Sequence, residues 1–117
     1  GQEDEQADAD WLVKKILNMR IFEDEEGKMN QDLKSVAGEL MVVSQFTLHA
    51  STKKGNRPSF IRAADPDRAI PLYDAYITEC EQALNQHVAT GMFGAQMEVS
   101  LVNKGPVSIW LDSRNKE

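Results

Sequence analysis

The sequence contains one cysteine, two histidines and no long apolar run. The single cysteine, Cys80, excludes an internal disulfide and a zinc site built from several cysteines, and it is typical of a reducing compartment. The longest aliphatic run, Leu40-Met41-Val42-Val43, is far shorter than the roughly 20 apolar residues that cross a bilayer. Because no charged-then-apolar signal segment opens the chain, we expect neither a membrane span nor secretion.

A chain of 117 residues has room for one domain. Residues 1–7 are polar and acidic, and we interpret them as a lead-in or as the cut edge of a longer protein. Residues 8–117 form the expected single domain.

The charge is acidic overall but unevenly distributed. Nineteen acidic side chains against 13 basic ones give a net charge of −6, which argues against extensive nucleic-acid binding. From Leu40 to Ala64, however, there is no acidic residue, and this stretch carries Lys53, Lys54, Arg57 and Arg62. Such a loop could contact the phosphates of a polyanion. Charge alone favours the plainer interpretation of a solvated lysine loop.

Two amphipathic helices are predicted. In the first, Asp8 or Asp10 is the cap and the apolar spacing extends to about Met19. The second begins at Asp65-Pro66, where proline lacks an amide that would be unpaired anyway, and Pro71 should strain its early turns. Its apolar stripe is Leu72, Tyr73, Tyr76, Ile77, Cys80 and Leu84. Because Cys80 lies on this stripe, we interpret it as a small buried hydrophobe and not as a nucleophile.

Extended segments are predicted around these helices. Ile21-Phe22 is a short extended piece before a turn at Gly27, Leu40–Leu48 is a buried strand, and His49–Ser59 is a loop. From Met97 to Leu111 apolar and polar residues alternate on both sides of Asn103-Lys104-Gly105-Pro106, which indicates a hairpin. A cis Gly105–Pro106 bond would cost only about 0.5–1 kcal/mol. Together these elements predict a single α/β domain with a mixed sheet and two helices packed on one side.

The usual catalytic patterns are missing. His49 and His87 have no spacing that indicates a triad or a metal site, and no phosphate-cradling glycine loop is present. Ser44, Gln45 and Thr47 place three hydrogen-bonding side chains in a segment otherwise suited to burial, so they are either paired internally or face a ligand. A hydroxyl without a nearby base is a poor nucleophile, which favours positioning over covalent attack.

Two motifs at a characteristic separation resemble the D-aminoacyl-tRNA deacylase family. They are Ser44-Gln45-Phe46-Thr47-Leu48 and Asn103-Lys104-Gly105-Pro106-Val107. The intervening sequence is similar in order and spacing, including Lys54-Gly55-Asn56-Arg57-Pro58-Ser59-Phe60 and Thr90-Gly91-Met92-Phe93-Gly94-Ala95. The similarity runs from about Ala7 to Ser113. It departs from the family at Ser108, where threonine is usual, and the chain begins where family members have completed their first strands.

The resemblance implies a specific activity. Family members hydrolyse the ester that joins a D-amino acid, or glycine mischarged on tRNA-Ala, to the terminal adenosine of tRNA, as cytoplasmic homodimers without metal or other cofactor. By this resemblance Ser44, Gln45, Phe46 and Thr47 form the catalytic segment, and Phe93, Gly94 and Ala95 help to bind the adenosine. A cis Gly105–Pro106 pair would enter the partner subunit's site and exclude L side chains. Lys53, Lys54 and Arg57 would contact the tRNA backbone.

Three alternatives remain open. The first is an editing domain of the threonyl-tRNA synthetase type, which clears L-serine. The second is a non-catalytic RNA-binding module that uses Lys53, Lys54 and Arg57. In the third, the Gly105-Pro106 turn has a purely structural role.

Overall fold

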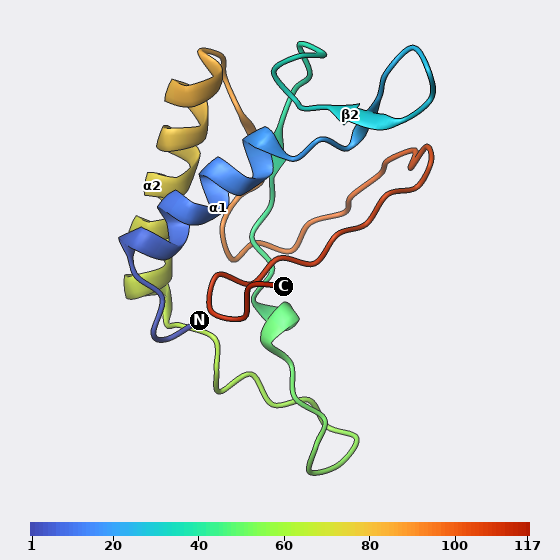
Figure 1. Ribbon diagram of the computed structural model, residues 1–117. Helices are drawn as coiled ribbons and strands as arrows, with labels where there is room; N and C mark the ends of the chain where they lie inside the picture. Colours follow the sequence, from blue (N-terminus) through green and yellow to red (C-terminus); the bar gives the residue numbers. More distant parts are fainter.

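The computed structural model describes residues 1–117, with both helices on one side and short strands and long extended segments on the other (Figure 1). In chain order the elements are α1 (Gln6–Asn18), β1 (Phe22–Glu23), β2 (Met29–Gln31), β3 (Met41–Val42), the 3₁₀ helix η1 (Phe46–His49), α2 (Pro66–Leu84) and β4 (Ala89–Thr90). This arrangement confirms the predicted mixed α/β fold class. Neither helix has the length and apolar content to span a membrane.

Helix α1 begins at Gln6 with Glu5 as its cap, three residues before Asp8 and five before Asp10, the two predicted caps. The Asp8 carboxylate accepts a hydrogen bond of 2.8 Å from the backbone amide of Glu5, which closes the first turn. Ala9, Val13 and Leu17 are the buried residues of this helix, at the i, i+4 spacing that the sequence predicts. The lead-in expected for residues 1–7 therefore overlaps the helix at Gln6 and Ala7.

Helix α2 begins at Pro66 after Asp65, as predicted, and ends at Leu84. The cap residue that follows, Asn85, has a φ of 52°, in the left-handed region. Pro71 lies inside this helix, which continues through it even though proline supplies no amide hydrogen to the preceding turn. Cys80 is completely buried, and burial raises the pKa of its thiol. The prediction of a small buried hydrophobe at this position is confirmed.

The strands form two separate pairs. β1 and β2 are antiparallel, joined by a turn in which Gly27 has a φ of 75°. β3 and β4 are parallel, with Met41 opposite Ala89 and Val42 opposite Thr90. The predicted strand Leu40–Leu48 is wrong beyond Val42, because the chain turns into η1 and no further strand is present for it to pair with. Phe46 and Leu48 are 58% and 62% exposed, so the predicted burial of this segment is also wrong.

In the predicted hairpin the chain reverses direction as expected, but the backbone hydrogen bonds between its two limbs are absent. Residues 97–111 run out and back as an extended arm, and no backbone hydrogen bond joins its two limbs (Figure 1). A strand needs a paired edge and a covered apolar face, and this arm has neither. The predicted cis bond at Gly105–Pro106 is also wrong: every peptide bond is trans. The trans form is intrinsically favoured, and nothing packs around this exposed turn to offset that preference.

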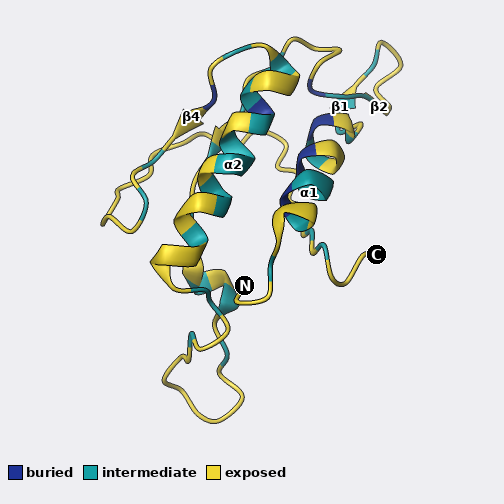
Figure 2. Ribbon diagram, turned by 90° about the vertical axis from the view of Figure 1, so that its left-hand side faces the viewer, coloured by how far each residue is buried: buried dark blue, intermediate teal, exposed yellow.

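The core is small and lies between the helices. Val13, Leu17, Leu33, Cys80 and Val88 form one cluster, and only six of 117 residues are buried (Figure 2). The radius of gyration is 15.8 Å, larger than the about 13 Å of a compact 100-residue domain. Much of the apolar surface on the strand side is therefore uncovered, and part of it lines an open cleft.

Candidate functional site

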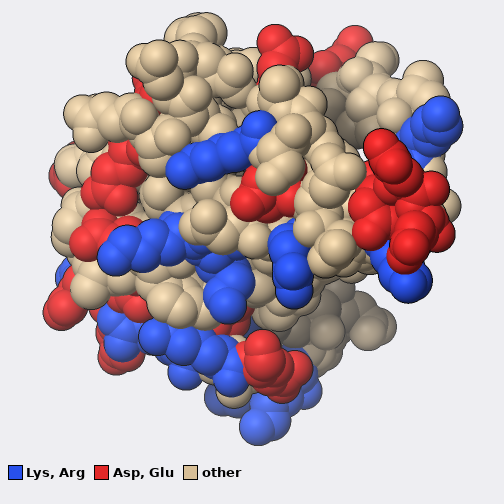
Figure 3. Space-filling model, turned by 45° about the horizontal axis from the view of Figure 1, so that its top comes forward, with Lys and Arg blue, Asp and Glu red and all other residues tan.

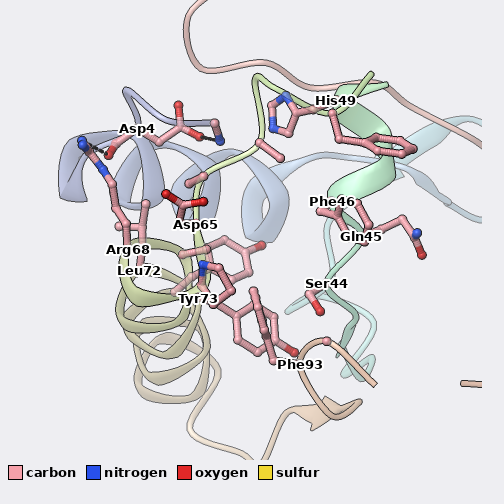
Figure 4. Close-up of a pocket in the computed structure, with 18 of the residues that line it drawn as sticks. Asp4, Ser44, Gln45, Phe46, His49, Asp65, Arg68, Leu72, Tyr73 and Phe93 are labelled. Atoms are coloured by element: carbon pink, nitrogen blue, oxygen red, sulfur yellow. Dashed lines mark hydrogen bonds and ion pairs between the residues drawn. The ribbon is translucent and has the colours of Figure 1, made fainter. Parts of the chain in front are cut away.

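A cleft of about 680 Å³ lies between α2 and the segment that contains η1. Figure 4 shows Arg68, Leu72 and Tyr73 on the α2 side, and Phe46 and His49 on the opposite side. Phe93 closes the space between these two walls. The lining is mostly apolar, with a few polar groups, which is the usual composition of a small-molecule site.

Two contacts hold the walls in place. The Tyr73 hydroxyl donates a 3.1 Å hydrogen bond to the carbonyl oxygen of Val42, which ties α2 to the end of β3 just before Ser44. The Tyr73 ring also meets Phe93 edge to face, with centroids 5.5 Å apart. Because β4 pairs with β3, the chain after Thr90 starts beside the chain after Val42. The fold thus brings together two segments that are distant in the sequence.

Six of the residues predicted from sequence line this one cleft: Ser44, Gln45, Phe46, Phe93, Gly94 and Ala95. Thr47 lies next to it, and its hydroxyl accepts a hydrogen bond of 2.5 Å from the side-chain amide of Gln45. The Thr47 hydroxyl contacts no carboxylate or imidazole, so no general base activates it in this structure. Gly94 has a φ of 73°, which favours glycine over any L residue at this point of the wall.

The remaining predicted residues lie outside the cleft. Gly105 and Pro106 are exposed at the tip of the extended arm. Lys53, Lys54 and Arg57 are exposed in a loop that projects at the bottom of the molecule in Figures 1 and 2. Within one chain, neither group contacts the Ser44–Thr47 segment.

Among the cleft residues that the sequence does not predict as site residues are His49, Phe60 and Tyr73. Burial lowers the pKa of His49, which favours the neutral form of its imidazole. Tyr73 was assigned only to the helical stripe, although a hydroxyl on a buried stripe needs a hydrogen-bond partner and was a usable signal. Phe60 stands in a polar loop, where nothing local indicates a role in a cleft.

The site has no group of three or more His, Cys, Asp or Glu side chains arranged to hold a metal ion. It offers aromatic walls, the side chains of Ser44 and Gln45 at the start of η1, a few charged side chains such as Asp65 and Arg68, and one histidine. The fold and site therefore define a small α/β protein with a partly aromatic cleft of a size suited to a small ligand, in which Thr47 contacts no general base.

The comparisons with known proteins identify this class more closely. Residues 1–112 match the family model described as D-Tyr-tRNA(Tyr) deacylase, and the chain belongs to this family. It is 61% identical over 114 residues to the D-aminoacyl-tRNA deacylase of Cytophaga hutchinsonii, covering 97% of this chain and 76% of that protein. With the D-aminoacyl-tRNA deacylase of Bacteroides thetaiotaomicron the identity is 54% over 116 residues, covering 99% and 77%.

A solved structure shows the same fold. The c-Myc DNA Unwinding Element Binding Protein superimposes with a TM-score of 0.84 and 38% sequence identity. The superposition covers 92% of this chain and 72% of that one.

Proposed function

We propose that the protein hydrolyses the ester bond of D-aminoacyl-tRNA, and of glycyl-tRNA mischarged on tRNA-Ala, releasing the free amino acid and tRNA. The observation that carries this proposal is the convergence of Ser44–Phe46 and Phe93–Ala95 in one cleft of a chain from the deacylase family. The activity is a chiral proofreading hydrolysis, and we place it in the cytoplasm, where aminoacyl-tRNA is used.

Water is the proposed nucleophile. Its oxygen attacks the ester carbonyl carbon, and backbone amides around Gln45, Phe46 and Thr47 donate to the oxyanion that develops. The bond between that carbon and the ribose oxygen then breaks, and the ribose oxygen takes a proton. Thr47 is not the proposed nucleophile, because its hydroxyl is paired with the Gln45 side chain and contacts no side-chain base. In this proposal the 2′-hydroxyl of the RNA assists the attacking water. Phe93, Gly94 and Ala95 hold the terminal adenosine.

A second copy of the chain completes the proposed site. The arm of residues 97–111 leaves large apolar side chains uncovered, among them Leu101, Val102 and Trp110 at 70%, 94% and 70% exposure. Exposed apolar surface of this extent is typical of an interaction site. In the proposed homodimer the arm docks on the partner, and the carbonyl groups of Gly105 and Pro106 line the partner's cleft. An L side chain would collide with them, whereas a D side chain or a hydrogen would not.

The tRNA backbone is proposed to contact Lys53, Lys54 and Arg57. The surface supports local contacts of this kind despite the net charge of −6. On the face shown in Figure 3, basic side chains lie across the middle and lower part, and acidic ones lie at the right-hand edge, along the left side and at the top. If these lysines meet phosphates, Lys53→Ala and Lys54→Ala each weaken binding to every tRNA and reduce the salt slope by about one.

The test of the activity compares D-tyrosyl-tRNA, L-tyrosyl-tRNA and L-seryl-tRNA as substrates. We expect rapid release of D-tyrosine and negligible release of either L-amino acid. Equal hydrolysis of the two tyrosyl esters refutes chiral selection. Clearance of L-serine supports the synthetase-type editing alternative, and binding of tRNA without cleavage supports a non-catalytic module.

Mixing two inactive variants tests the shared site. One variant carries Gly105→Trp, and the other carries a disabled catalytic segment, Gln45→Ala with Thr47→Ala. If the arm serves the partner's cleft, a mixed dimer regains one intact site. An equal mixture then recovers about a quarter of wild-type activity from statistical pairing in a two-fold dimer. If each arm serves its own cleft, mixing restores nothing.

A further inference from the structure

We propose that Phe60, with Phe46 and the basic loop Thr52–Pro58, forms a ledge that binds the unpaired nucleotide next to the terminal adenosine of the tRNA. This inference rests on the proposed function and extends it, because it concerns RNA beyond the hydrolysed end. The stacking residue is Phe60, which lies outside the catalytic segment Ser44–Thr47.

The two rings form a pair at the edge of the cleft. The centroids of Phe46 and Phe60 are 5.1 Å apart and the ring planes meet at 73°, an edge-to-face contact. In this geometry the ring that presents its edge keeps both faces free of its partner. Both residues line the cleft, and Phe46 remains 58% exposed. The pair is therefore a surface feature and not part of the core.

The basic loop is fixed to this pair. Ser51 and Ser59 exchange two backbone hydrogen bonds of 2.8 and 2.9 Å, which clamp the base of the loop. Phe60 directly follows the clamp, so the aromatic pair and the exposed cations of the loop are parts of one small unit. The loop carries Lys53, Lys54 and Arg57 and no acidic residue. Proteins bind single-stranded nucleic acid by combining an aromatic face, on which a base stacks, with nearby cations that contact the phosphates.

The substrate supplies the matching chemistry. The acceptor end of tRNA is a single strand, so the base that precedes the terminal adenosine is free to stack on an aromatic ring. With the adenosine held by Phe93–Ala95, the preceding phosphates run toward the loop cations and the preceding base toward Phe60. Charge complementarity and the continuity of the ledge with the cleft favour this occupant over a protein partner.

The test compares two substrates that differ only in the nucleotides beyond the adenosine: D-tyrosyl-tRNA and the nucleoside ester D-tyrosyl-adenosine. For Phe60→Leu, the ratio of kcat/KM on tRNA to kcat/KM on the nucleoside should fall about ten- to a hundred-fold, the range expected for one lost base–aromatic stack. Phe60→Trp should restore the ratio. The matched control is Ile61→Ala, since Ile61 is 78% exposed and does not line the cleft.

Several results would overturn the proposal. An equal loss of kcat/KM on both substrates means that Phe60 only shapes the ester or adenosine pocket, and an unchanged ratio means that no base stacks there. A Phe60→Leu variant that changes its sedimentation from dimer to monomer means that the pair belongs to a protein interface.

A binding measurement keeps the ledge testable apart from catalysis. An RNA hairpin that carries no amino acid and has an unpaired 3′ tail should bind Phe60→Leu at least ten-fold more weakly than the wild type. A blunt hairpin should bind both proteins equally. Equal affinity of the two proteins for the tailed hairpin refutes the ledge. Failure of the proposed hydrolysis, in contrast, would show in the wild type itself as no cleavage of either ester.

Discussion

Replacing Tyr73 with phenylalanine removes one hydrogen bond from the cleft and little else. The Tyr73 hydroxyl donates to the carbonyl of Val42 at 3.1 Å, two residues before Ser44. Burial, with a contribution from Asp74, raises the pKa of Tyr73, so the hydroxyl keeps its proton and can donate throughout the neutral range. The ring of the variant can still meet Phe93. Tyr73→Phe therefore isolates the link between α2 and the end of β3.

The expected cost is modest and measurable. Losing a hydrogen bond between a tyrosine and a half-buried carbonyl group lowers the free energy of unfolding by about 1 kcal/mol. For a domain of this size that corresponds to a fall in Tm of roughly 4 °C. Tyr73→Leu also loses the edge-to-face contact with Phe93, which adds about 0.5–1.5 kcal/mol. Because Val42 directly precedes the Val43-Ser44 segment, kcat/KM should fall several-fold in both variants.

Urea unfolding followed by circular dichroism measures these differences, and release of D-tyrosine from D-tyrosyl-tRNA measures the activity. A double-mutant cycle with Tyr73→Leu and Phe93→Leu should give a coupling energy of about 0.5–1.5 kcal/mol for the ring pair. A Tyr73→Phe variant with wild-type stability and activity would refute the link between α2 and β3. A coupling energy near zero would refute the contact between the two rings.

Three further predictions concern the core, the cleft wall and acid stability. Leu17→Ala, at a site 2% exposed, should lower the free energy of unfolding by about 2–5 kcal/mol in urea unfolding. Gly94→Ala should lower it by about 1 kcal/mol, because Gly94 has a φ of 73°, whereas Ala95→Gly should have a smaller effect. Hydrogen bonds from the Glu5 amide and Ser113, with the charge of Arg114, lower the pKa of Asp8 below 3.8. Asp8 thus stabilises the fold above the unfolded pKa, and this stabilisation is lost as the pH falls through the folded pKa. Asp8→Asn should flatten the loss of stability between about pH 5 and 2, measured by thermal unfolding.

The helices were predictable because their signals are local. Asp65 and Pro66 mark the start of α2 by capping chemistry alone, and the stripe that ends at Leu84 needs only helical periodicity. Cys80 was assigned correctly for the same reason, since its place on the stripe decides its environment. The predicted cap of the first helix differs from the observed one, Glu5, by at least three residues, because Asp8 acts from inside the first turn and not as the cap.

The extended segments were less predictable because strands depend on partners that local sequence does not name. The residues from Val43 to Leu48 have the composition of a buried strand, yet only Met41 and Val42 have a paired neighbour, β4. The lining of the cleft was also only partly predictable, because some of its residues are placed by contacts between distant segments. Ser44–Phe46 could be chosen by composition and resemblance, whereas His49 and Phe60 enter the cleft through η1 and the loop clamp, which are tertiary features.

The errors in the strand predictions and the isolation of Gly105 and Pro106 have one physical explanation. An alternating sequence such as Met97–Leu111 is selected for a paired edge and a covered face, and in one chain it has neither. Its exposed apolar side chains, Trp110 at 70% among them, would favour association over the monomeric state. Docking on a second copy would supply the missing cover and would carry Gly105 and Pro106 to a partner's cleft in the same step. In the homodimer that we propose, one interface would cover the apolar side chains of the arm and would also supply the missing wall of the cleft.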